Sequence, residues 1–241
     1  MDASLKTSVV DTKQWYEQYY GAKGAARNNI LRDAGALFQL VAHDVALIRA
    51  LRSVSANQDS AVVLDVGCGD GGNIFLLLRL GFKPTNLFGI DIQEDRIAKA
   101  KSKNPLIAFQ CADAARQDFP DNTFDLVMES ALFIHLTDEI LAKQIAEEMV
   151  RVTKLGGSLL IADWRYPKPG NPNYNAVSRR RIMHLFGVGT RTEAYKTFRG
   201  PLVPPAGRFL SKYFSWLYFL VHALFPFLAG HTVTVLKKVA S

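Results

Sequence analysis

The sequence predicts a single α/β domain built on a largely parallel sheet, and three observations lead to that fold class. Short apolar runs alternate with helical stretches of ten or more residues between residues 61 and 163, and successive parallel strands need crossover helices of that length. The chain of 241 residues is long enough for one domain with a full core and short for two. Internal repeats and low-complexity tracts are absent from the sequence, so a repeat architecture is not expected.

The expected elements follow one another from residue 11 to residue 163. Residues 11–52 are expected to be helical, because apolar residues such as Leu37, Val41 and Ile48 recur at helical spacing without an intervening proline. Strands are then expected over 61–66, 87–92, 106–110, a run ending near Met128, and 158–162. The helices between them are expected from the glycine-rich turn to Leu80, over 94–102 and over 138–153.

The last third of the chain, residues 164–241, is less regular. A proline-rich loop near Pro167 should precede a helix over 174–186 and a strand over 191–198. The apolar stretch 209–228 is expected to be helical and to lead into a final strand over 232–236. No charged residue occurs from Tyr213 to Ala229, but Pro226 shortens the helix and a strand follows, so a membrane span is not expected. A narrow polar stripe marks this helix: Ser211, Ser215, Tyr218 and His222.

Charge and cysteine content limit the partners and the compartment. The net charge is +7 and the isoelectric point about 9.4, which suits an anionic partner or, equally, a solvated basic surface. The two cysteines form no disulfide framework or metal-ligand pattern, so no metal is expected. The first residues lack a secretory pattern, so a cytoplasmic location is expected. Peripheral contact with the inner face of the membrane is compatible with that location.

The glycine-rich turn carries the first chemical signal. Gly67, Gly69 and Gly71 fit a G-x-G-x-G pattern, and the dinucleotide pattern G-x-G-x-x-G fits equally well. Asp65 argues against the dinucleotide pattern, because a carboxylate beside this turn would repel the pyrophosphate of a dinucleotide. S-adenosylmethionine (SAM) carries an ammonium and a sulfonium group instead, so the carboxylate favours SAM. Cys68, between the first two glycines, needs only to be small.

Two further carboxylates follow the next strands. Asp91, followed by Ile92, ends the second strand, where a carboxylate can accept both ribose hydroxyls. Asp113, followed by Ala114, comes after the third strand and can accept from an adenine amino group while a neighbouring backbone N–H serves a ring nitrogen. Together they predict a nucleoside site.

Five motifs in order resemble those of class I SAM-dependent methyltransferases: VLDVGCGDG, GIDI, ADA, FDLVMESALFIHL and LGGSLLIAD, covering roughly residues 61–163. The resemblance implies a seven-stranded, mostly parallel, Rossmann-like sheet with an antiparallel last strand. It implies SAM as cofactor and S-adenosylhomocysteine as product. Asp65 and Gly67 would face the methionine end, and Cys68 and Gly69 would be cofactor-binding residues of the same turn. Glu129 would lie near the methionine amino group through its main chain. The N-terminal helices 11–52, with Tyr19, Tyr20 and Arg27, would form a lid or simply pack as helices.

The catalytic group and the acceptor are less defined by the sequence. His135, just past the fourth strand, and Asp163, at the end of the fifth, are the candidate bases, and each has a structural alternative as a packing or capping residue. By analogy with the family, the sixth strand runs parallel to its neighbours, so the insert 209–228 would emerge on the cofactor face. There it would line the acceptor pocket, touch a membrane or form a homodimer interface.

The tail after the fifth strand is similar to bacterial surface-polysaccharide methyltransferases, which favours O-methylation of a sugar hydroxyl in a glycan or glycolipid. The alternatives are a lipophilic small-molecule acceptor, such as a quinone precursor, and a non-catalytic SAM-binding module. A nucleic-acid acceptor is not expected, because the base-flipping motif after the fourth strand is missing.

Overall fold

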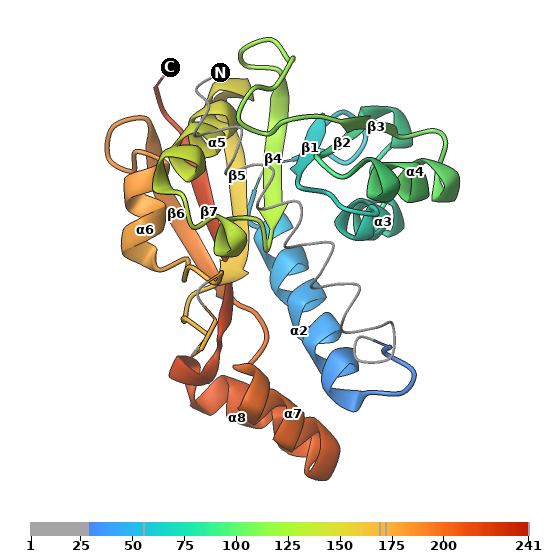
Figure 1. Ribbon diagram of the computed structural model, residues 1–241, viewed down its shortest axis with the longest axis vertical. Coiled ribbons are helices and arrows are strands. Elements are labelled where there is room, and N and C mark those ends of the chain that lie inside the picture. Colours follow the sequence, from blue (N-terminus) through green and yellow to red (C-terminus); the bar gives the residue numbers. More distant parts are fainter. Residues whose placement is uncertain (1–28, 55, 169, 172, 241) are drawn as a thin grey trace.

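The computed structural model describes residues 29–240 except 55, 169 and 172. Its centre is a seven-stranded sheet of order β3-β2-β1-β4-β5-β7-β6 (Figure 1). β1 to β5 run parallel, and β7 pairs antiparallel with both β5 and β6. The predicted fold class, a mostly parallel sheet with an antiparallel last strand, is therefore confirmed. The expected helix and lid side chains between residues 11 and 28 lie outside the described residues.

The strands and helices have the following bounds. The strands are β1 (Val63–Val66), β2 (Leu87–Asp91), β3 (Ala108–Cys111), β4 (Phe124–Ser130), β5 (Thr153–Trp164), β6 (Thr192–Arg199) and β7 (His231–Lys238). The α-helices are α2 (Ala34–Leu51), α3 (Gly72–Arg79), α4 (Glu94–Lys103), α5 (Glu139–Val152), α6 (Arg179–Leu185), α7 (Pro204–Tyr213) and α8 (Tyr218–Leu224). Short 3-10 turns cover Pro84–Asn86, Phe133–His135, Ser215–Leu217 and Pro226–Leu228.

Two hydrophobic cores lie on opposite faces of the sheet. One contains side chains of α2, α3 and α4 with Val63, Met128 and Leu160 of the strands. The other contains side chains of α5 and α6 with Leu64 and Val127. Neighbouring strand residues point to opposite faces, which is why the apolar runs of β1 and β4 are buried on both sides.

Helix α2 is long and apolar enough, by length and composition, to cross a membrane, and it is the one described helix that meets those criteria. Its buried residues, among them Ala46, Leu47 and Ala50, pack in the core on the sheet. Its start is fixed by Asp33, whose carboxylate accepts a hydrogen bond from the Gly35 amide at 2.7 Å. One face of α2 therefore packs in the core, while Leu37, Leu40, Val41 and Val45 are exposed among the described residues.

Three expectations for the last third need correction. The helix expected over 174–186 begins only at Arg179, where the Ser178 hydroxyl caps it by accepting from the Arg181 amide at 3.2 Å. The stretch 209–228 is no single helix, because the chain breaks at Phe214 (φ −143°) between α7 and the turn before α8. The sixth strand pairs in the sheet with β7 alone, and that pairing is antiparallel. β6 nevertheless runs in the direction of β5, so the insert does emerge at the carboxyl edge of the parallel strands.

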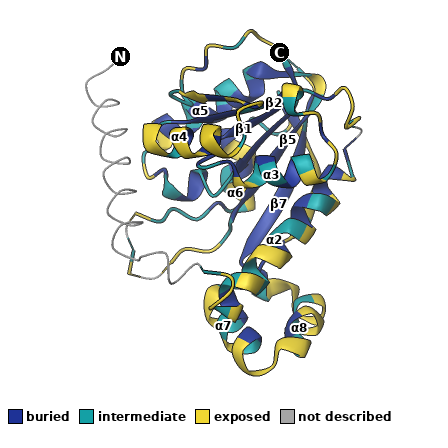
Figure 2. Ribbon diagram, turned by 90° about the vertical axis from the view of Figure 1, so that its right-hand side faces the viewer, coloured by how far each residue is buried: buried dark blue, intermediate teal, exposed yellow. Residues whose placement is uncertain are grey.

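We call residues 204–228, which include α7 and α8, the hairpin. The hairpin projects beyond the end of the sheet and away from the body of the domain (Figures 1 and 2). Many of its residues are exposed along its length (Figure 2).

Candidate functional site

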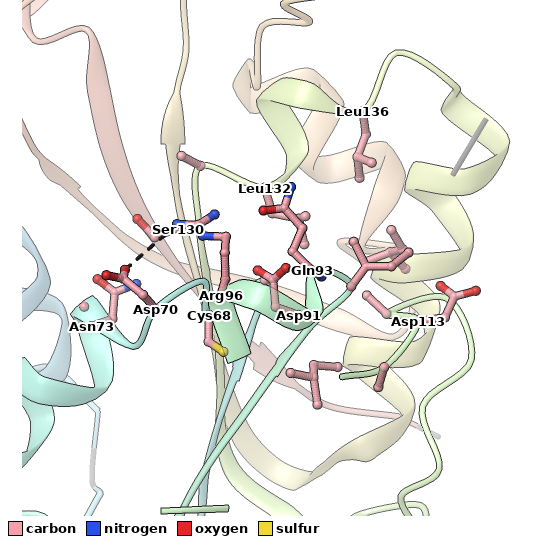
Figure 3. A pocket seen from close by; sticks show the side chains of 18 of the residues that line it. Cys68, Asp70, Asn73, Asp91, Gln93, Arg96, Asp113, Ser130, Leu132 and Leu136 are labelled. Atoms are coloured by element: carbon pink, nitrogen blue, oxygen red, sulfur yellow. Dashed lines mark hydrogen bonds and ion pairs between the residues drawn. The ribbon is translucent and has the colours of Figure 1, made fainter. Parts of the chain in front are cut away.

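A cavity of about 250 Å³ lies at the carboxyl ends of β1, β2 and β4 (Figure 3). Ligands of open parallel sheets bind at this edge, where the loops after neighbouring strands converge. Its lining comprises Gly67, Cys68, Asp70, Gly72, Asn73, Ile90, Asp91, Ile92, Gln93, Arg96, Ala112, Asp113, Ala114, Ser130, Ala131, Leu132, Leu136, Leu141 and Ile145. Six predicted cofactor residues are among them: Gly67, Cys68, Asp91, Ile92, Asp113 and Ala114.

The glycine-rich turn forms one wall of the cavity. The amides of Gly67 and Cys68 both donate to the Ile90 carbonyl, at 2.8 and 2.9 Å, which bends the chain across the end of β2. Gly67 has φ 72° and Gly69 has φ 56°, a left-handed conformation that glycine adopts without a steric cost. A Cβ on Gly67 would also lie 3.3 Å from a methyl carbon of Leu132. The two glycines therefore let the backbone pass close to whatever occupies the cavity.

Asp91 links the turn to the end of β2. One carboxylate oxygen accepts from the Gly69 amide at 2.9 Å and the other accepts from the Gln93 amide at 2.9 Å. Asp91 lies near the centre of the cavity, beside Arg96 and Gln93 (Figure 3). Each carboxylate oxygen can accept a second hydrogen bond, so Asp91 can hold the turn and still accept from two ribose hydroxyls.

The far end of the cavity suits a flat aromatic base. Asp113 fixes its own loop, because its carboxylate accepts from the Ala115 amide at 2.9 Å. Apolar side chains surround the space beside it: Ala112, Ala114, Leu136, Leu141 and Ile145. An apolar slot with one carboxylate at its rim can hold adenine and recognise its amino group.

Two buried carboxyl groups lie just behind the lining. Asp65 on β1 and Glu129 on β4 are both fully buried. Neither oxygen of Asp65 and only one oxygen of Glu129 has a hydrogen bond with a described residue. Burial raises the pKa of Asp65 to about 8, and the nearby Asn73 amide offsets only part of that rise. Burial, together with the charge of Asp163, raises the pKa of Glu129.

Unpaired buried carboxyl groups at this position fit a cationic ligand. Burial of a carboxylate is costly without a partner charge or hydrogen bonds, and the ammonium and sulfonium of SAM are such charges. Asp65 and Glu129 would thus stabilise the methionine end, while Asp91 and Asp113 would hold the ribose and the adenine. The residues present therefore fit SAM along the whole length of the cavity.

The two predicted catalytic residues lie outside the cavity lining. Asp163 is buried, and its two oxygens accept from the amides of Ile134 at 2.9 Å and Trp164 at 2.7 Å. The His135 ring packs edge-on against Tyr174, with ring centroids 5.2 Å apart. Burial lowers the pKa of His135 to about 4, which leaves a weak base at neutral pH. Both roles remain predictions, and neither side chain adjoins the space beside the turn.

The structure brings together a pair that the sequence reasoning missed. Ser130, at the end of β4, lines the cavity, and its hydroxyl lies 3.1 Å from Nε2 of His43 on α2. Nδ1 of His43 lies 3.5 Å from the carboxylate of the neighbouring Asp44. A carboxylate on one imidazole nitrogen leaves the other free to accept a proton. His43 and Ser130 are 87 residues apart in the sequence, so no local pattern links them.

The fold and the cavity support a class I SAM-dependent methyltransferase domain with SAM as the cofactor. Residues 63–157 match the family model described as a methyltransferase domain. The chain is 38% identical over 106 residues to 2-methyl-6-phytyl-1,4-hydroquinone methyltransferase of Synechocystis sp., which is 42% of this chain and 31% of that protein. It is 31% identical over 131 residues to phosphoethanolamine N-methyltransferase 3 of Arabidopsis thaliana, 52% of this chain and 26% of that protein.

The match to these relatives thus covers less than a third of their length. Among solved structures, the fold is similar to geranyl diphosphate C-methyltransferase from Streptomyces coelicolor A3(2), solved with Mg²⁺, geranyl diphosphate and S-adenosyl-L-homocysteine. The TM-score is 0.59 at 14% identity, over 80% of this chain and 77% of that chain. This likeness supports the fold assignment.

Proposed function

We propose that the protein transfers the methyl group of SAM to a lipophilic small molecule that bears a hydroxyl group or an activated ring carbon. The observation that carries the proposal is the contact between Ser130, at the cofactor cavity, and His43. When bound, SAM supplies an activated methyl group on a sulfonium centre. An oxygen or carbon that gains this methyl group must lose a proton, and His43 Nε2 is placed to accept it.

Positioning and proton removal are the chain's own contributions. Asp91 and the glycine-rich turn would fix the cofactor, since Asp91 already holds that turn through the Gly69 amide. The Ser130 hydroxyl can donate to Nε2 and accept from the acceptor's hydroxyl, so it can relay the proton to His43. Asp44 would then stabilise the imidazolium. Holding the reacting groups in place supplies much of the rate in such a transfer.

A lipophilic acceptor is favoured over a sugar by two observations. The Synechocystis relative is named for a phytylated hydroquinone. The hairpin, at the same edge of the sheet as the cavity, exposes large apolar side chains such as Trp216 and Phe227. The Arabidopsis relative is named for phosphoethanolamine, so the comparisons alone do not choose the acceptor. An apolar surface at this edge of the sheet suits an apolar molecule better than a glycan.

The test is transfer of radiolabelled methyl from SAM to two acceptor panels, prenylated hydroquinones and monosaccharide or glycan hydroxyls. We expect label in an organic-extractable hydroquinone product. Label in the glycan panel alone would contradict the lipophilic acceptor. Calorimetry shows separately whether the protein binds SAM. If it binds SAM but transfers no label to either panel, nor to a broad extract of small molecules, the protein is a non-catalytic SAM-binding module.

A further inference from the structure

The hairpin carries large apolar side chains on its outer surface as well as in the small hydrophobic cluster that it forms with α2. The buried residues of α7 and α8 are Gly207, Ser211 and Tyr218. Nine exposed side chains of the hairpin are large and apolar, between 44% and 76% exposed: Phe209, Tyr213, Phe214, Trp216, Phe219, Leu220, Leu224, Phe225 and Phe227. At about 200 Å² for each fully exposed residue, this surface is on the order of 1,000 Å², larger than the apolar patches of most monomers.

Specific contacts hold the hairpin in this orientation. The Tyr218 hydroxyl accepts from the Leu202 amide at 3.2 Å, and its ring lies 4.9 Å from that of Phe38 on α2. Arg165 donates to the carbonyls of Pro226 and Phe227, at 2.8 and 3.1 Å. These contacts tie α8 and the closing turn to the domain. These contacts therefore keep the apolar side chains on the outer surface of the hairpin.

Positive charge is concentrated in the part of the chain that carries the hairpin. Residues 164–241 contain twelve Lys and Arg and a single acidic residue, Glu193, a net charge of +11. Residues 1–163 contain seventeen Lys and Arg and twenty-one Asp and Glu, a net charge of −4. Lys212 lies on α7 itself, and Arg179 and Lys196 line a groove of about 390 Å³ between α6 and β6, together with Arg165. An apolar projection is thus accompanied by cationic side chains.

We propose that the hairpin docks this protein onto an anionic lipid bilayer, with its apolar face in the acyl region and exposed cations of residues 164–241, among them Arg179, Lys196 and Lys212, at the headgroups. Interfacial segments combine buried apolar area with attraction to anionic lipid. The charge selects a bilayer over a second copy of the chain, because a symmetric dimer through the hairpins would juxtapose two cationic regions. The hairpin follows β6 and precedes β7 at the carboxyl edge of the parallel strands, so docking would turn the cofactor edge toward the lipid.

Vesicle flotation tests the proposal with the full chain and two matched variants. The hairpin variant carries Trp216→Gln, Leu224→Gln and Phe227→Gln, at positions 76%, 64% and 62% exposed. The control variant carries Leu106→Gln and Leu155→Gln, at positions 71% and 63% exposed, ahead of β3 and near the start of β5. Neither variant changes the net charge. The vesicles consist of phosphatidylcholine alone or of phosphatidylcholine with about 30% phosphatidylglycerol, which is anionic.

We expect the unmodified protein and the control variant to float with the anionic vesicles, and binding to fall in high salt. The hairpin variant should lose at least about tenfold in partition, since each polar substitution removes apolar area from the lipid contact. A third variant, Arg179→Gln with Lys196→Gln and Lys212→Gln, should lose roughly a hundredfold on anionic vesicles, at about fivefold for each cation. This third variant keeps the apolar face of the hairpin, so it still tests lipid docking if the hairpin variant fails to fold.

Three results would overturn the proposal. One is failure of the unmodified protein to float with anionic vesicles. Another is flotation of the folded hairpin variant, or of the charge variant, equal to that of the unmodified protein. The third is a dimer in sedimentation equilibrium that the hairpin substitutions convert to a monomer. Lipid docking does not rest on methyl transfer, and SAM calorimetry on the same samples shows separately whether the cofactor site is intact.

Discussion

Replacing Asp91 with alanine should destabilise the fold and weaken SAM binding at the same time. The carboxylate accepts two backbone hydrogen bonds at 2.9 Å, from Gly69 and Gln93, and it is 9% exposed. A hydrogen bond to a charged group contributes about 1.5–3 kcal/mol, so the variant should lose about 3–6 kcal/mol of unfolding free energy. For a chain of 241 residues this corresponds to a decrease in Tm of roughly 6–24 °C, at about 2–4 °C per kcal/mol.

The effect on the cofactor is separate in origin. Two ribose hydroxyls would lose their acceptor, which should weaken SAM by about 1–3 kcal/mol, or roughly 5- to 150-fold. Asp91→Asn keeps one acceptor oxygen in place and presents an amide NH₂ to the other backbone donor. This variant should therefore lose about half of the stability that alanine loses, while SAM binding still falls.

Thermal melting without ligand and calorimetry with SAM measure the two losses. Asp95→Ala is the matched control, because Asp95 is exposed on α4 and its nearest cation, Lys99, lies 3.6 Å away across an exposed ion pair. It should change stability by less than about 0.5 kcal/mol. An Asp91→Ala protein that melts with the unmodified protein would refute the role of the carboxylate in holding the turn. Unchanged SAM affinity would place the ribose elsewhere.

The remaining predictions concern the buried ionisable groups. Asp65 has a pKa of about 8 in the folded protein and about 3.8 in the unfolded chain, so the folded state binds one proton more between these pH values. The free energy of unfolding of the ligand-free protein should therefore fall by about 1.4 kcal/mol for each pH unit as the pH rises through this range. Urea unfolding at pH 5 and pH 8 should show a smaller decrease for Asp65→Asn, and equal decreases would contradict the assignment. His43→Gln should lower turnover about 10²-fold with SAM affinity retained, whereas His135→Ala should do so only if that imidazole is the base. Asp163→Asn should lower Tm, since its carboxylate accepts the Ile134 amide at 2.9 Å; an unchanged Tm would argue against that structural role.

The core of the fold could be predicted because its signals are local. β1, β2 and β4 are short apolar runs that end in acidic or polar residues, and parallel strands bring those ends to one edge. Asp91 and Asp113 follow two such strands, so their convergence on one cavity follows from the topology alone. The backbone bonds of Asp91 could not be predicted in this way, because they depend on the path of the turn after β1.

The pair of His43 and Ser130 shows where local signals end. His43 lies on a largely apolar helix, and nothing in its spacing distinguishes it from a packing residue. Its significance comes from α2 lying across the carboxyl end of β4, a contact between segments 87 residues apart. His135 follows β4 directly and so attracted the catalytic prediction, but the turn Phe133–His135 carries its ring to Tyr174. Position along the chain did not give side-chain direction.

The orientation of the hairpin side chains could not be predicted from the sequence either. The spacing of Ser211, Ser215, Tyr218 and His222 predicted a polar stripe, and a stripe on a helix is ordinarily expected to face water. In the structure Ser211 and Tyr218 are buried, and His222 Nε2 lies 2.8 Å from the Gly200 carbonyl oxygen. Ser211, Tyr218 and His222 thus find partners within the protein, whereas Ser215 is exposed. Covering even a fifth of the roughly 1,000 Å² left outside would contribute about 5 kcal/mol at about 25 cal/mol per Å². That figure is comparable with the entire stability of a small domain, so covering even part of the outward face would stabilise a complex with a partner substantially.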